Sequence, residues 1–219
     1  MRRRIIPKTP GGQRFRHETR RFHLFRSLFG FSLAGLLIGL AACEPAKHVL
    51  AKQASAPPAV GGPFVLTDQN GARATEATLR GKWTLVFFGY TFCPDVCPIT
   101  LSNLGAAMEK MGAEARNVRV VFITVDPDRD TPAQLKTYLS SPSFPPGMIG
   151  LTGTTAQVAD VAHAYHVYFR KAGTGRGYSV DHTSVVYLMN PQGLFDRPVD
   201  VSSAPEGVAR QIESAMRGA

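Results

Sequence analysis

The sequence predicts an α/β fold in which a mixed central sheet is flanked by helices. Two apolar runs rich in β-branched and aromatic residues, 83–88 and 118–125, are typical of buried central strands. Between them, apolar side chains recur at helical spacing and predict a helix over residues 98–115. Strands that alternate with helices in this way are characteristic of a sheet with helices packed on its faces.

The remaining elements carry their own signals along the chain. Residues 64–66 are apolar and precede the turn sequence Asp68-Gln69-Asn70-Gly71, which predicts a short strand entering a tight turn. Pro132 directly after Thr131 predicts a helix over 131–139, because proline suits the first helical turn. Further expected elements are a helix containing Val158, Val161, Ala162 and Tyr165, a strand over 184–189, and a closing helix with Val208, Ile212 and Met216.

Two cysteines, Cys93 and Cys97, stand where the first long strand gives way to a helix. This placement narrows the expected α/β architecture to a thioredoxin-like fold. Pro98 suits the first helical position, so we expect Cys97 at the helix cap, where free backbone N–H groups and the helix dipole favour a thiolate. Three residues separate the cysteines, whereas ordinary thiol oxidoreductases have two, and this spacing favours metal binding.

The N-terminal segment predicts export from the cytoplasm. Residues 1–26 contain nine Lys or Arg and one acid, and residues 27–42 form an uncharged, mostly apolar run. This pattern is typical of a signal peptide, and it ends in Leu40-Ala41-Ala42-Cys43, which looks like a bacterial lipobox. We therefore expect a lipoprotein-type signal peptide over 1–42, a lipid on Cys43 and a domain facing the periplasm at the cell membrane; an uncut membrane anchor is the alternative.

The rest of the chain reads as a tether and one domain. Residues 43–62 are rich in Ala, Pro, Lys and Ser, which predicts a flexible tether, and residues 63–219 are enough for a single domain with its own core. From Cys43 onward sixteen basic residues meet fifteen acidic ones, so the chain's net charge of +9 belongs almost entirely to the signal peptide. Without a basic surface on the mature domain, we expect no nucleic-acid partner.

The donor atoms of the cysteine pair favour copper. Two soft thiolates suit Cu(I), and an added imidazole would also hold Cu(II), whereas a zinc site needs further protein ligands and the chain has no second cysteine pair. His17 and His23 lie in the signal peptide and His48 in the tether. His163 and His166 are expected in packing or surface roles, and Met108 and Met111 in the core. His182, which precedes the strand over 184–189, is the candidate third ligand.

Three ordered motifs resemble the SCO/SenC family of copper proteins over residues 63–219. They are Gly89-Tyr90-Thr91-Phe92-Cys93-Pro94-Asp95-Val96-Cys97-Pro98, then Val125-Asp126-Pro127-Asp128-Arg129-Asp130-Thr131-Pro132, then Val180-Asp181-His182-Thr183 before Tyr187-Leu188. Thr183 stands where serine is common in the family, and Asn190 where an acid is frequent. Neither position is a proposed ligand.

The resemblance implies a thioredoxin-like copper-binding domain that holds one copper ion through Cys93, Cys97 and His182. It also implies a role in assembling the dinuclear copper centre of cytochrome c oxidase, with the copper-acceptor subunit as partner; we further expect contact with other periplasmic copper chaperones. The leading interpretation is a metallochaperone and no enzyme. The alternatives are a thiol-disulfide reductase, in which Cys93 and Cys97 reduce the acceptor's cysteines, and a thiol peroxidase, against which the second cysteine and His182 speak.

The acids in and around these motifs are expected to shape the chain and not to bind the metal ion. Asp126, Asp128 and Asp130 precede a predicted helix, so we interpret them as capping and turn residues. Asp95 and Asp181 adjoin proposed ligands, and they would either shape the local turn, orient those ligands or dock a partner. None of the five is predicted to be a ligand.

Overall fold

The computed structural model describes residues 59–218, apart from the side chain of Arg176. The predicted signal peptide (1–42), Cys43 and most of the predicted tether (43–58), with the histidines at positions 17, 23 and 48, lie outside the described residues. Among the residues that are described, no helix is both long enough and apolar enough to cross a membrane.

A seven-stranded mixed sheet forms the centre of the domain, in the strand order β2-β1-β5-β4-β3-β8-β9. Its strands β3, β4 and β5 run parallel, and the pairs β1/β5, β1/β2, β3/β8 and β8/β9 are antiparallel. The bounds are β1 (Val65–Asp68), β2 (Arg73–Thr75), β3 (Trp83–Gly89), β4 (Val118–Thr124), β5 (Ile149–Thr152), β8 (Val186–Met189) and β9 (Phe195–Val199).

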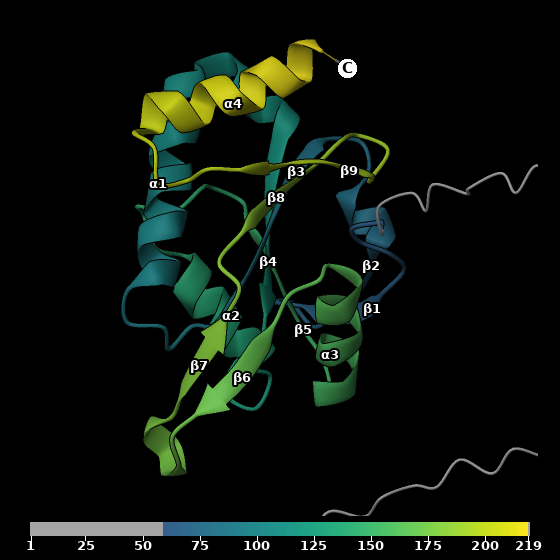
Figure 1. Cartoon of the computed structure of the whole chain (residues 1–219), viewed down its shortest axis with the longest axis vertical. Helices are drawn as coiled ribbons and strands as arrows, with labels where there is room; N and C mark the ends of the chain where they lie inside the picture. The colour runs from purple at the N-terminus through teal and green to yellow at the C-terminus, as the bar shows by residue number, and fades with distance from the viewer. Residues whose placement is uncertain (1–58, 219) are drawn as a thin grey trace, which may run out of the picture. The chain divides into compact units, whose positions relative to one another are not determined.

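Two further strands form a separate two-stranded antiparallel sheet, β6 (Phe169–Ala172) with β7 (Ser179–His182). Figure 1 shows this hairpin projecting at one end of the main sheet, with β7 running back toward the site described below. The hairpin is not among the elements predicted from sequence. Most of its residues are exposed or half-buried, with Val180 the buried one, and they include charged side chains, so no apolar run marks them.

Four α-helices lie beside the main sheet, α1 (Val96–Met111), α2 (Pro132–Leu139), α3 (Thr155–Ala164) and α4 (Pro205–Arg217). In Figure 1 α1 and α2 lie on one side of β3 and β4, α3 lies on the other, and α4 crosses α1. Short 3-10 turns cover Glu76–Leu79, Gly112–Asn117 and Gly175–Gly177. The predicted fold class, a thioredoxin-like mixed sheet flanked by helices, is confirmed.

The residues at their N-terminal ends determine where α2 and α1 begin. The side chain of Thr131 accepts a hydrogen bond from the backbone N–H of Gln134, so α2 starts with a capped end and Pro132 in its first turn. The α1 helix starts at Val96, two residues before the predicted position, with Asp95 as N-cap. Cys97 therefore lies inside the first turn of α1 and not at its cap, which corrects the prediction.

Central strands and helix faces together build one core. Strand β3 is buried at every position, and β4 at all but one, because helices cover both faces of the sheet. Leu101, Leu104, Met108 and Met111 of α1 pack into this core, so the interpretation of the two methionines as core residues is confirmed. At the other end of the described chain, the Gly61 backbone N–H donates to the carbonyl of Ala164, which attaches residues before Pro63 to the end of α3.

Candidate metal centre

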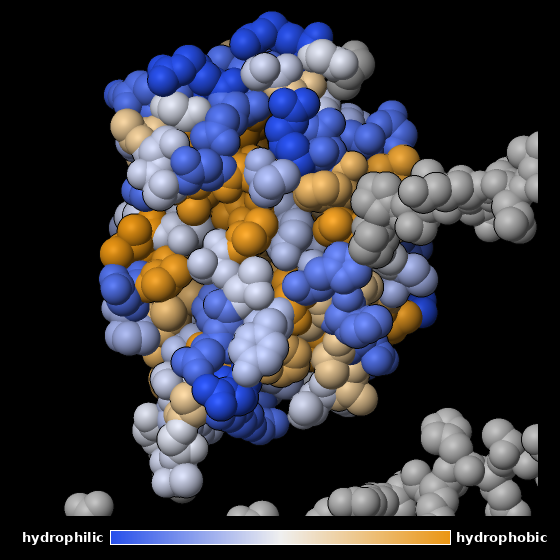
Figure 2. Space-filling view, in the orientation of Figure 1, coloured by the Kyte–Doolittle hydropathy of each residue, from blue (hydrophilic) through white to orange (hydrophobic). Residues whose placement is uncertain are grey.

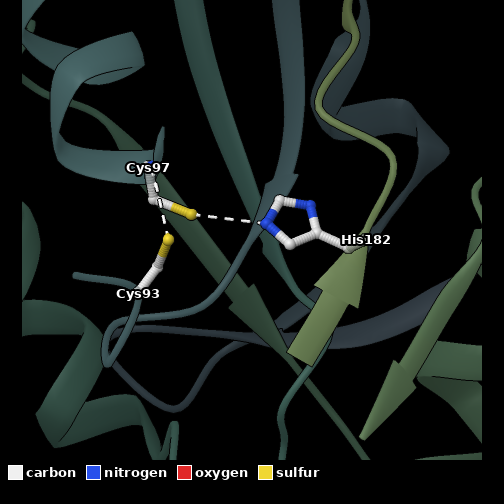
Figure 3. A group of neighbouring side chains, drawn as sticks. All are labelled: Cys93, Cys97 and His182. Carbon is white, nitrogen blue, oxygen red and sulfur yellow. Dashed lines mark hydrogen bonds between the residues drawn. The ribbon is translucent and has the colours of Figure 1, made fainter. Parts of the chain in front are cut away.

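Cys93, Cys97 and His182 come together at one end of the main sheet, as Figure 3 shows. One donor atom from each residue lies within 4.8 Å of the other two. The distance from the Cys97 Sγ to the His182 Nε2 is 3.6 Å, although 85 positions separate these residues in the chain. The structure thus brings together the three residues that sequence analysis singled out.

The two cysteines differ in exposure. Cys97 is buried and Cys93 is half-buried, and no disulfide joins them. The backbone N–H of Cys97 is directed at the Cys93 Sγ at 3.5 Å, so the start of α1 provides a donor for the sulfur one turn earlier. The loop turns back at Tyr90, whose carbonyl accepts from the Cys93 N–H at 3.2 Å.

Gly89, the last residue of β3, makes room for the Cys97 sulfur. A Cβ atom at this position would lie 2.8 Å from the Cys97 Sγ and 2.8 Å from a ring carbon of Phe122, both far inside van der Waals contact. Only glycine therefore allows α1 to begin so close to the sheet. The sequence signal for this requirement is the glycine at the start of the first motif.

The orientation of His182 is set by its own backbone neighbourhood. Its Nδ1 lies 3.0 Å from the carbonyl oxygen of Thr183, and because a carbonyl can only accept, Nδ1 carries the proton. The Nε2 lone pair then faces Cys97, which is the arrangement that a histidine ligand requires. The rings of Tyr90 and Phe87 pack edge-on against the imidazole, with centroid distances of 5.8 and 6.3 Å.

Burial determines the protonation of both groups when no ion is bound. It lowers the pKa of His182 below the usual value, so the imidazole is neutral at physiological pH. It also raises the pKa of Cys97 well above that of a free thiol, and the neighbouring Cys93 raises it further. In the metal-free protein, burial therefore acts against the thiolate that the helix start was expected to favour at Cys97. A bound metal ion displaces such a proton.

Asp126 and Asp130 are fully buried and do more than cap or turn the chain, which corrects the simpler expectation. Asp130 accepts three hydrogen bonds, from the backbone N–H of Thr91 (3.0 Å) and from the hydroxyls of Thr91 (2.7 Å) and Thr124 (2.6 Å). It thereby holds the loop before Cys93 against the end of β4. Burial raises the pKa of Asp130, although these donors favour its charged form.

Arg129 makes the long-range contacts that sequence reasoning missed. Its Nε donates to the Asp126 carboxylate at 2.5 Å and its Nη1 to the backbone carbonyl of Tyr178 at 3.0 Å. The guanidinium also lies over three aromatic rings, with its Cζ 3.7 Å from the ring centroid of Tyr178, 4.7 Å from that of Phe92 and 5.7 Å from that of Tyr90. We name these five residues the Arg129 cluster. The sequence pattern that indicates this cluster is Arg129 between two acids, Asp128 and Asp130, shortly after a buried strand.

The remaining acids and histidines that were considered for the site lie on the surface. Asp95 is exposed and its side chain makes no cap hydrogen bond. Asp181 is exposed and forms an ion pair with Arg170 at 3.1 Å, and Asp128 forms one with Lys171. His163 and His166 are exposed, and in the described part of the chain neither belongs to the group of potential metal ligands, in agreement with their expected surface role.

The donor set fits copper better than the other common metal ions. Two sulfurs and one imidazole nitrogen match the preference of Cu(I) for thiolates and of Cu(II) for added nitrogen, and hard ions prefer oxygen. Within residues 59–218 the group contains only these three residues, fewer than the four that a structural zinc site uses.

Comparisons with known proteins agree with this reading. Protein SCO1 homolog 1, mitochondrial, of Arabidopsis thaliana is 42% identical over 160 residues, which are 70% of this chain and 47% of that protein, so the chain spans about half of that relative's length. The copper-bound structure of Bradyrhizobium japonicum ScoI is similar at a TM-score of 0.66 and 47% identity, covering 72% of this chain and 99% of the other.

A third similar structure is that of BsSco, a member of the Sco family of cytochrome c oxidase assembly proteins in which a disulfide switch was identified. Its TM-score is 0.57 at 25% identity, with 73% of this chain and 95% of the other covered. The family model described as SCO1/SenC matches residues 52–217, which are most of the sequence and the whole of the site. On this match, and on the Cys-Cys-His group that the first and third motifs form, the chain belongs to the SCO1/SenC family.

Proposed function

We propose that this protein is a copper metallochaperone of cytochrome c oxidase assembly. It binds one copper ion through Cys93, Cys97 and His182 and hands it to the subunit that carries the dinuclear copper centre. Copper is the cargo of this reaction and leaves with the acceptor. The observation that carries the proposal is the Cys-Cys-His group with its donor atoms within 4.8 Å of one another.

The three donors suit transfer as well as binding. Cu(I) is stable with two thiolates, so the ion can remain on the cysteines while the imidazole leaves. An acceptor thiolate then takes the free coordination position, and the remaining donors are replaced one at a time. Cu(II) uses the imidazole more strongly, so the same site holds either oxidation state.

Exposed apolar side chains around the donors support docking of a protein acceptor. Figure 2 shows hydrophobic residues at the surface near the start of α1, above the β6–β7 hairpin. Phe92, Val96 and Ile99, which adjoin the cysteines in sequence, are 52%, 45% and 55% exposed. Tyr168, whose backbone N–H donates to the Thr183 hydroxyl beside His182, and Val185 are also exposed. Such a rim around a metal site is typical of a surface that is covered when a partner binds.

A copper titration tests the proposal. The full chain, reduced, is titrated with Cu(I) and Cu(II) beside Cys93→Ser, Cys97→Ser and His182→Ala. We expect the unaltered protein to bind one copper ion per chain. The cysteine variants should lose binding of both Cu(I) and Cu(II), and His182→Ala should lose much more affinity for Cu(II) than for Cu(I). Reduced protein that binds no stoichiometric copper would overturn the proposal.

A thiol-disulfide reductase is the second candidate, and the unequal exposure of the two cysteines favours it. The half-exposed Cys93 would attack a partner disulfide as a thiolate, forming a mixed disulfide and releasing one partner thiolate. Cys97 would then lose its proton and attack the Cys93 sulfur, which releases the second partner thiol and leaves a Cys93–Cys97 disulfide. Two electrons pass to the partner in this exchange. His182→Ala separates the candidates, because it should impair Cu(II) binding and leave disulfide exchange nearly intact.

We also propose that the domain is attached to the membrane through a lipid on Cys43 and faces the periplasm. The support is the lipobox-like sequence that ends the apolar run at residues 27–42. Mass spectrometry of the mature N-terminus should find a lipid-modified cysteine. Cys43→Ser should prevent this modification, and an intact N-terminus in the unaltered chain would favour the uncut membrane anchor.

A further inference from the structure

The two halves of the proposed copper site belong to different parts of the fold. Cys93 lies in the connection between β3 and α1, and Cys97 lies in the first turn of α1. His182 ends β7, whose only strand partner in the described chain is β6. The distance between imidazole and thiols therefore depends on contacts that hold the hairpin against the rest of the domain.

The Arg129 cluster provides such contacts to both halves at once. Toward the hairpin, Arg129 donates to the Tyr178 carbonyl at 3.0 Å and its Cζ lies 3.7 Å from the centroid of the Tyr178 ring. Toward the cysteine loop, the guanidinium lies over Phe92, the residue before Cys93. Both contacts are fixed to the end of β4 by Asp126, which accepts from Arg129 at 2.5 Å and from the Tyr178 hydroxyl at 2.6 Å.

Burial makes this cluster different from the other ion pairs of the hairpin. The side chains of Arg129 and Asp126 are 16% and 0% exposed, whereas those of Arg170 and Asp181 are 67% and 53% exposed. Exposed pairs contribute little because water and salt screen them, while a shielded, hydrogen-bonded pair holds its geometry. Val180 also packs in the core and helps to seat β7, and its backbone makes a hydrogen-bonding contact with Tyr90, so the Arg129 cluster acts beside a second, smaller link between the hairpin and the cysteine loop.

We propose that Arg129 is a positioning residue that fixes the distance between the His182 imidazole and the two thiols. In this role it acts through its contacts with the rings of Tyr178 and Phe92, which connect the hairpin and the cysteine loop to one guanidinium. A lysine cannot replace it, because an ammonium lacks the planar face and the fixed fork of donors that serve Asp126 and the Tyr178 carbonyl together. This inference rests on the proposed copper site and assigns to Arg129 the positioning of its third ligand, His182.

The test compares Arg129→Lys and Arg129→Leu in the full chain, with Arg170→Leu as a matched control on the same hairpin. We expect both Arg129 variants to lower Cu(II) affinity roughly 10- to 100-fold, as is typical for residues that orient a metal ligand. The nitrogen hyperfine coupling of bound Cu(II) should be weakened or lost, and Cu(I) affinity should remain because the thiolates stay in place. Arg170→Leu should match the unaltered protein in all three measurements.

Two further measurements separate positioning from a general loss of stability. In the His182→Ala background, Arg129→Lys should cause no additional loss of Cu(II) affinity, because both changes act through the same ligand. In the metal-free chain, the backbone amides of Ser179–His182 should exchange hydrogen faster in Arg129→Lys than in Arg170→Leu.

Several outcomes would overturn the inference. Unchanged Cu(II) affinity and nitrogen coupling in folded Arg129→Lys would do so, as would an additive loss in the His182→Ala background. If Arg129→Leu leaves Asp126 unpaired and fails to fold, Arg129→Lys alone decides, since it keeps a charge for Asp126. If the unaltered chain binds no copper, the proposed function fails separately, and the exchange rates of the two arginine variants still decide whether Arg129 holds the hairpin.

Discussion

Gly89→Ala should destabilise the protein and disturb its metal site through a single methyl group. The new Cβ would lie 2.8 Å from the Cys97 Sγ and 2.8 Å from a Phe122 ring carbon, so about 0.6 Å of displacement is needed to reach even a tight contact near 3.4 Å. Phe122 is fully buried in β4 and cannot move, so the start of α1 has to yield.

The size of the effect follows from two opposing terms. Replacing a strand glycine with alanine gains about 0.5–1 kcal/mol from the reduced freedom of the unfolded chain. Overpacking a buried site costs about 1–3 kcal/mol, which leaves a net loss of about 0–2.5 kcal/mol in the free energy of unfolding. We expect the upper half of this range, because the new Cβ meets two buried atoms at 2.8 Å. A metal ligand displaced by this amount no longer meets its partners well, and we expect copper affinity to fall roughly tenfold.

Denaturant unfolding of the metal-free chain and copper competition of the reduced chain measure the two effects. Gly62→Ala is the matched control, because its Cβ would meet only Ala164 at an ordinary 3.7 Å. If Gly89→Ala retained both the stability and the copper affinity of the unaltered protein, the close approach of Cys97 to β3 would not shape the site as described.

Two other predictions concern buried polar groups. Asp130→Ala removes the acceptor of three hydrogen bonds and should lower the free energy of unfolding by about 2–4 kcal/mol in denaturant titrations. As the control, Asp128→Ala breaks the exposed pair with Lys171 and should cost less than about 1 kcal/mol. Equal losses in the two variants would contradict the role given to burial. Burial lowers the pKa of His182, so as pH falls below about 6.5 the unfolded chain takes up the proton first and the stability of the metal-free protein should decrease. The decrease should be smaller in His182→Gln, and identical pH profiles would refute the assignment.

The parts of the fold that could be predicted are those with local signals. The apolar runs of β3 and β4 and the helical spacing of α1 report burial directly, since each residue's neighbours in sequence share its environment. Strand β5 is only four residues long and contains a glycine, and the β6–β7 hairpin carries charged side chains, so neither has an apolar pattern long enough to recognise.

At the site, the cysteine pair was predictable from spacing alone, whereas His182 was linked to it through family resemblance. Its ring meets Cys97 across 85 positions, and no local pattern encodes such a contact. The buried acids show the same difficulty, because aspartate is ordinarily exposed and their partners are distant: Thr91 lies 39 positions from Asp130 and Tyr178 lies 52 positions from Asp126.

The small size of the β6–β7 sheet has a consequence for the mobility of the His182 imidazole. Its ladder consists of four residue pairs, and opening it leaves all seven strands of the main sheet in place. Local openings of this kind need far less free energy than global unfolding and occur on much shorter timescales. The imidazole of His182 can therefore move away from the two thiols without unfolding of the domain, and the lifetime of the Cys-Cys-His arrangement is separate from the lifetime of the folded domain.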